Sequence, residues 1–147
     1  MLLKDLITNL LKLTTIVLFV IALFLPAYSG HEGYVVLILG ALAWFGLPQI
    51  IGFFAWTANI FLFYSFLSKH RVQVKLVLSA IAVILGALGY FVDEIYVTEG
   101  GNKEHIEVKF GYYFWMGSMV SNFALQLFQN KKDELLDFLI NFKREYL

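Results

Sequence analysis

The lysine and arginine residues of this chain lie almost entirely in alternate connections between its long apolar runs. Nine of the eleven precede the first run, separate the second from the third or follow the last. These nine are Lys4, Lys12, Lys69, Arg71, Lys75, Lys131, Lys132, Lys143 and Arg144. If the chain crosses a bilayer four times with both ends in the cytoplasm, all nine lie on the cytoplasmic side, as the positive-inside rule expects. The pattern therefore predicts an integral membrane protein with four spans and cytoplasmic termini.

The acidic residues have the opposite distribution. Six of the eleven fall in connections that the four-span arrangement places outside, so the zero net charge divides into about +4 inside and −4 outside. The predicted outer acidic surface comprises Glu32, Asp93, Glu94, Glu104 and Glu107. The basic residues suit anionic lipid head groups at the inner surface. No basic patch exceeds a short loop, so nucleic acid is not expected as a partner.

The composition supports a single transmembrane domain. The chain has 147 residues, of which 60% are hydrophobic, whereas soluble domains hold about 45–50% apolar residues. No cysteine is present, which excludes disulfides and thiolate ligands. The first run also has features of a signal peptide, because Ala27-Tyr28-Ser29 follows it as a small-x-small site. The long leader, which contains Asp5, favours an uncleaved span.

The apolar runs set the expected elements of an all-α four-helix bundle. The four spans are expected at about residues 8–27, 48–68, 75–92 and 110–129. Residues 34–47 are apolar but too few to cross, which predicts a short helix in the outer interface or re-entering the membrane. Residues 94–109 alternate in character around a Gly-Gly turn and predict an extracytoplasmic β-hairpin. Residues 131–147 predict an amphipathic helix on the inner leaflet.

Small and polar residues form stripes on three of the expected spans. Asn59 lies on the second span, and Ser118, Asn122 and Gln126 follow one face of the fourth. The third span carries a small-residue face for helix packing: Ser79, Ala82, Gly86 and Gly89. Such faces turn toward other helices in lipid, so we interpret the amides as hydrogen-bonding residues between helices. The alternative is that they line a pore or substrate path.

No pattern in the sequence indicates catalysis or a cofactor. Phosphate loops, nucleophile elbows and zinc-protease pairs do not occur. His31 and His105 are near carboxylates, but their spacing is not that of a metal site, and a solvated acidic surface is the simpler interpretation. We therefore expect a protein that is not an enzyme and holds no metal.

Two short motifs carry a resemblance. Trp56-x-x-Asn59, followed by Gly111-Tyr112-Tyr113-Phe114-Trp115 and Ser118, resembles a pattern of small, uncharacterised bacterial membrane proteins with four spans. The resemblance implies the bacterial cytoplasmic membrane and no assigned activity. The layout is also similar to the claudin topology, but the cysteine pair of the first claudin loop is missing, so no barrier function is implied. Small membrane immunity proteins share this size and plan.

Two functions from different classes follow as expectations. The first is a non-enzymatic protein of accessory or immunity type that binds a protein partner, or itself, through its outer face or bundle. The alternative is an oligomeric channel or small transporter lined by the polar stripe of the fourth span.

Overall fold

The chain is mostly helical, with a small antiparallel hairpin, as predicted. The computed structural model describes residues 2–42, 50–96 and 103–146. Within these ranges it has five α-helices: α1 (Leu2–Phe24), α2 (Gly33–Leu42), α3 (Ile50–Leu67), α4 (Val72–Leu88) and α5 (Phe110–Tyr146). The 3-10 helix η2 (Gly89–Phe91) extends α4. Strands β1 (Pro26–Tyr28) and β2 (His31–Glu32) form one antiparallel pair, and β3 (Glu94–Tyr96) and β4 (Lys103–His105) form the other.

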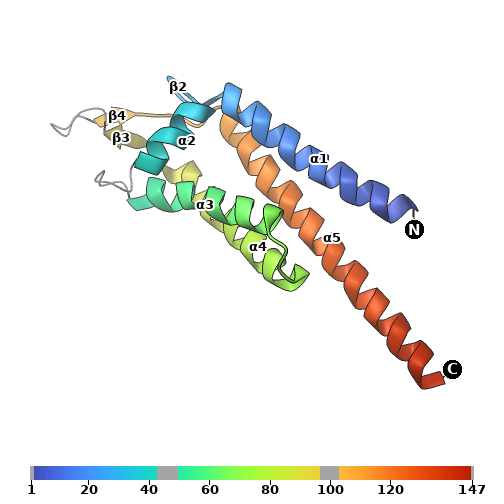
Figure 1. The fold of residues 1–147 in the computed structure, drawn as a ribbon. Helices are drawn as coiled ribbons and strands as arrows, with labels where there is room; N and C mark the ends of the chain where they lie inside the picture. Colours follow the sequence, from blue (N-terminus) through green and yellow to red (C-terminus); the bar gives the residue numbers. More distant parts are fainter. Residues whose placement is uncertain (1, 43–49, 97–102, 147) are drawn as a thin grey trace.

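The helices lie side by side, with all strands at one end (Figure 1). Helix α1 packs along the first part of α5, while α3 pairs with α4, which also packs on α5. The first turn of α1 and the α3–α4 connection lie at the end opposite the strands. Helix α2 lies at the strand end and contacts both α1 and α3. The second half of α5 extends beyond the other helices.

Several boundaries differ from the expected ones. Helix α5 runs without interruption through 37 residues, where a span at 110–129 and a separate helix at 131–147 were predicted. No glycine or proline follows Gly117, so nothing in the sequence breaks the helix there. Helix α2 has ten residues, about 15 Å of helix, and cannot cross a hydrocarbon core of about 30 Å. Residues 43–47 of the predicted outer helix and the turn at 97–102 lie outside the described residues.

The pairing of β1 with β2 was not predicted. The turn between the two strands contains Gly30 at φ +74°, a left-handed conformation that glycine adopts without strain. Backbone hydrogen bonds join this pair to the chain before α5: Ser29 N donates to Glu107 O at 2.9 Å and Lys109 N to Ala27 O at 2.9 Å. We call residues 26–32 together with the described residues of 92–109 the strand platform.

The small-residue face of α4 is buried. Ser79, Ala82, Gly86 and Gly89 are all inaccessible or nearly so. A Cβ placed on Gly86 would lie 2.7 Å from Met119 Sδ and 2.8 Å from Met116 Sδ, so the missing side chain lets α5 approach closely.

Large apolar side chains are exposed along the helices, while several polar side chains are buried together with the hydrophobic core. Examples of the exposed apolar side chains are Leu13 (58% exposed), Val77 (59%) and Ile84 (65%). The buried polar side chains are Thr15, Asn59, Ser65, Ser79, Ser118, Ser121, Asn122 and Gln126. By length and composition, Leu3–Phe24 and Val72–Phe91 qualify as candidate membrane spans, and Ile51–Leu67 is a shorter apolar helix. Two membrane-capable helices are consistent with membrane association.

Candidate functional site

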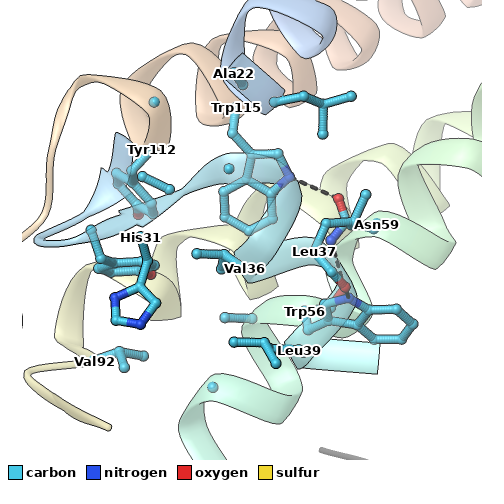
Figure 2. Close-up of a pocket in the computed structure, with 18 of the residues that line it drawn as sticks. Ala22, His31, Val36, Leu37, Leu39, Trp56, Asn59, Val92, Tyr112 and Trp115 are labelled. Carbon is cyan, nitrogen blue, oxygen red and sulfur yellow. Dashed lines mark hydrogen bonds between the residues drawn. The ribbon is translucent and has the colours of Figure 1, made fainter. Parts of the chain in front are cut away.

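A cavity of about 360 Å³ lies at the strand end, between α1, α2, α3 and α5. Its wall is mostly apolar and aromatic, as Figure 2 shows. Among its lining residues are Val36 and Leu39 from α2, Trp56 from α3, and Tyr112 and Trp115 from α5.

Glycines bring the surrounding elements close enough to form the wall. A Cβ on Gly33 would coincide with the carbonyl oxygen of Ala22, so α2 starts directly against α1. A Cβ on Gly40 would overlap the Trp56 ring, so α2 lies against that indole. Trp56 Nε1 donates a hydrogen bond of 2.7 Å to the Leu37 carbonyl oxygen, which ties α3 to α2.

Asn59 connects the two tryptophans of the wall. Trp115 Nε1 donates to Asn59 Oδ1 at 2.8 Å, and Asn59 Nδ2 donates to the Trp56 carbonyl oxygen at 3.0 Å (Figure 2). Trp56 and Asn59 from the first motif therefore meet Trp115 from the second. We call Trp56, Asn59 and Trp115 the tryptophan–asparagine cluster.

The tyrosines of the wall also have partners. Tyr28 Oη donates to the Gly89 carbonyl oxygen at 2.8 Å, and Tyr112 Oη donates to that of Gly86 at 3.2 Å. Burial raises the pKa of Tyr28 well above its usual range, so the hydroxyl stays protonated and remains a donor. The polar groups of these aromatic residues are thus directed to the protein itself.

A second set of hydrogen-bonded polar side chains lies farther from the strands, toward the α3–α4 connection. Asn122 Nδ2 donates to Ser65 Oγ at 2.7 Å, and Gln126 Nε2 donates to Asn122 Oδ1 at 3.0 Å and to the Ser65 carbonyl oxygen at 3.4 Å. Ser65 Oγ donates in turn to the Leu62 carbonyl oxygen at 3.0 Å. All three side chains are essentially inaccessible. We call Ser65, Asn122 and Gln126 the inner network; Gln126 Oε1 has no partner among the described residues.

The predicted polar stripe does not form one continuous network. Asn122 and Gln126 bond across to α3, Asn59 belongs to the tryptophan–asparagine cluster, and Ser118 Oγ donates within its own helix to the Trp115 carbonyl oxygen at 2.7 Å. Ser65 was not predicted, because Asn59 was the only polar residue assigned to a stripe on this helix. The buried face of α3 carries Ala55, Ala58, Asn59, Leu62 and Ser65, whose helical spacing was the available signal.

The strand platform brings together acidic residues from both strand pairs. Glu107 accepts a hydrogen bond of 2.7 Å from Lys109 Nζ, and this pairing lowers the pKa of the Glu107 carboxyl group. The Glu104 backbone belongs to β4, but the Glu104 side chain is not among those that the structure describes. No group of three or more His, Asp or Glu side chains suited to a metal ion occurs in the described ranges. The exposed carboxylates are those of Glu32, Asp93, Glu94 and Glu107.

Comparison with known proteins finds no match: no family model, curated protein or solved structure is significantly similar to the chain.

The tryptophan–asparagine cluster yields a prediction about stability. Trp115→Phe removes the indole donor and Asn59→Ala removes its acceptor, and each change should destabilise the helix bundle. In a double-mutant cycle the two residues should show a coupling of about 1 kcal/mol, typical of a buried side-chain hydrogen bond. The free energy of unfolding of the two single variants and the double variant, measured by denaturant titration in detergent, checks this value. Additive effects would mean that the 2.8 Å bond contributes nothing.

Proposed function

We propose that this chain is an integral membrane protein whose α1, α3, α4 and first part of α5 cross the bilayer. The observation that carries the proposal is the distribution of polarity: polar side chains are buried between helices, and large apolar ones are exposed on the outside. Water would make such a surface unfavourable, whereas lipid makes it favourable. The 18 residues of α3 extend about 27 Å, close to the hydrocarbon thickness of about 30 Å.

The two ends of the bundle support an orientation. Lys69 and Arg71 lie in the α3–α4 connection, at the end opposite the strands, whereas Glu32, Asp93 and Glu107 lie on the strand platform. The positive-inside rule then puts the α3–α4 connection and both termini in the cytoplasm and the strand platform outside. The resemblance carried by Trp56-x-x-Asn59 and Gly111-Tyr112-Tyr113-Phe114-Trp115 implies the bacterial cytoplasmic membrane.

The strand platform supports a binding function of accessory or immunity type rather than catalysis. Backbone hydrogen bonds join its first strand pair to the segment that follows β4, and the Tyr28 hydroxyl anchors the platform to the end of α4. A preorganised surface of this kind binds a partner without an ordering cost. Its exposed carboxylates favour a protein partner with a basic surface.

The alternative is an oligomeric channel in which α5 lines an axis. One observation favours it: Gln126 Oε1 is buried and has no partner among the described residues, as a group that binds water in a conducting path would be. The remaining contacts of the inner network favour packing, because Asn122 and Gln126 point to α3 and are hydrogen-bonded there. Oligomeric state in detergent separates the two proposals, since a monomer of this size leaves no room for a pore.

Site-directed photo-cross-linking tests the binding proposal. A photoreactive amino acid at His105, on the strand platform, should give a discrete adduct with a neighbouring protein in the native membrane. The same group at Lys69, at the opposite end, should not. Neutralising the platform with Glu32→Gln, Asp93→Asn and Glu107→Gln should remove the His105 adduct. An adduct only from Lys69, or one insensitive to neutralisation, would place the partner elsewhere.

A further inference from the structure

The cavity wall has few free hydrogen-bonding groups for a polar occupant. Trp56, Asn59, Trp115 and both wall tyrosines already use polar atoms in hydrogen bonds to the protein. Water enters a cavity when several unpaired polar groups receive it, and an apolar cavity stays dry. An empty apolar cavity also lowers stability in proportion to its volume. At about 360 Å³, this one is best stabilised by an apolar occupant.

One side of the cavity wall is formed by a residue that is also exposed on the apolar outside of the helices. Leu39 lines the cavity and is also 46% exposed. Its outward-facing neighbours on α2 and α3 are apolar as well: Ile38, Ile51 and Phe54 are all exposed. In a bilayer this outside contacts acyl chains, so an occupant that enters past Leu39 comes sideways from the lipid without crossing water.

The opposite side of the cavity has one polar group with a free position. Figure 2 places His31 and Val92 on one side of the cavity and Leu39 and Trp56 on the other. His31 Nδ1 lies 3.0 Å from the Ser29 carbonyl oxygen, which can only accept, so Nδ1 is the donor and Nε2 is the ring nitrogen left for a hydroxyl group, which can both donate and accept. Nε2 has no partner among the described residues. Glu32 and Asp93 directly follow His31 and Val92 in the sequence, and both carboxylates are exposed. Their negative charges disfavour an anionic head group near His31.

We infer that this cavity binds the acyl chain of an amphiphile from the outer leaflet, with a hydroxyl-bearing, non-anionic head group beside His31. The chain belongs either to a bilayer lipid or to a free single-chain amphiphile. This inference rests on the membrane insertion proposed above, which places the strand end in the outer leaflet.

Tryptophan fluorescence provides the test. In a Trp44→Phe background, the remaining tryptophans are Trp56 and Trp115, and both line the cavity. The full-length protein in detergent is titrated with a monoacylglycerol whose chain is brominated near its middle, because bromine quenches indole on close approach. We expect saturable quenching. A brominated fatty acid, ionised at the pH of the titration, should bind more weakly.

Two substitutions two residues apart on α2 form the matched pair. Val36→Phe fills the cavity and should weaken the apparent affinity about tenfold, the loss expected when roughly two methylene groups are excluded. Ile38→Phe, on the exposed side of the same helix, should leave the affinity unchanged. Val92→Phe fills the cavity from the His31 side and serves as the second variant if Val36→Phe does not fold.

The outcomes test whether the site exists and, separately, whether its acyl chain comes from a bilayer lipid or from a free amphiphile. Saturable quenching by a brominated phosphatidylcholine as well assigns the site to bilayer lipids, and quenching by the single-chain probe alone assigns it to free amphiphiles. Quenching that rises linearly with the probe, or that Val36→Phe and Val92→Phe leave unchanged, overturns the inference. Tighter binding of the fatty acid overturns the head-group assignment. Membrane insertion is measured separately by cysteine labelling, so a failed titration with intact topology refutes the cavity proposal alone.

Discussion

Gly111→Ala should lower the free energy of unfolding by about 3 kcal/mol, at the upper end of the usual cost of inserting a methyl group into a packed site. A Cβ at this position would lie 2.6 Å from Leu25 O, 2.8 Å from Pro26 O and 2.9 Å from Ala27 N. All three are backbone atoms at the start of β1. They cannot move separately, because Lys109 N donates to the Ala27 carbonyl oxygen and fixes β1 against the start of α5.

Two other glycine-to-alanine changes provide controls. At Gly86 the obstructing atoms are the sulfurs of Met116 and Met119, which belong to flexible side chains rather than to the backbone. At Gly117 the nearest atom is Leu18 Cδ1 at 3.4 Å, an ordinary contact. Both changes should be neutral or stabilising by up to about 1 kcal/mol, the helix preference of alanine over glycine. Denaturant titration in detergent measures all three, and equal losses at all three positions would contradict the packing at Gly111.

Asn122→Ala should cost about 1–2 kcal/mol of stability. The change removes the donor to Ser65 Oγ and the acceptor from Gln126 Nε2, and both partners remain buried. Hydrogen bonds between membrane helices contribute about 1 kcal/mol, and a buried group left without a partner adds to the loss. Loss of function should follow loss of folded protein.

Ser118→Ala is the matched control for the inner network. Ser118 is equally buried and lies about one turn away, but it bonds only to the Trp115 carbonyl oxygen of its own helix. Its removal should change stability by less than about 0.5 kcal/mol. If Asn122 lined a water-filled path, Asn122→Ala would leave stability unchanged and alter ion flux in liposomes instead. Asn122→Leu would then close the path, as hydrophobic constrictions do in channels.

The sequence contained enough information to predict α3, the packing face of α4 and the larger hairpin, but not that α5 is a single helix. Apolar runs predicted α3 within two residues at each end, because Pro48 and the polar Lys69–Arg71 segment delimit the run. Alternation predicted β3 and β4. The small-residue face of α4 lies against α5, since only small side chains allow that approach.

The remainder depended on tertiary contacts that no local pattern encodes. The pairing of β1 with β2 is supported by Glu107 and Lys109, some eighty residues away. Ser65 joins the inner network because the face of α3 that carries Ala55, Ala58 and Leu62 is buried. The sequence did not reveal this face, because α3 is apolar all round and shows no clear polar side. The cavity lies where α1, α2, α3 and α5 meet beside the strand platform. The sequence indicated Trp56 and Asn59 as a motif and Asn59 as part of a polar stripe, but not that both line a cavity.

The absence of cysteine in the chain allows the membrane arrangement to be measured directly. Single-cysteine variants Arg71→Cys, in the α3–α4 connection, and His105→Cys, in β4, are expressed in bacterial cells and treated with a membrane-impermeant maleimide. Four spans with the strand platform outside predict that His105→Cys reacts in intact cells whose outer membrane has been permeabilised. Arg71→Cys should react only after the inner membrane is opened. Labelling of Arg71→Cys while the inner membrane is intact would contradict the account.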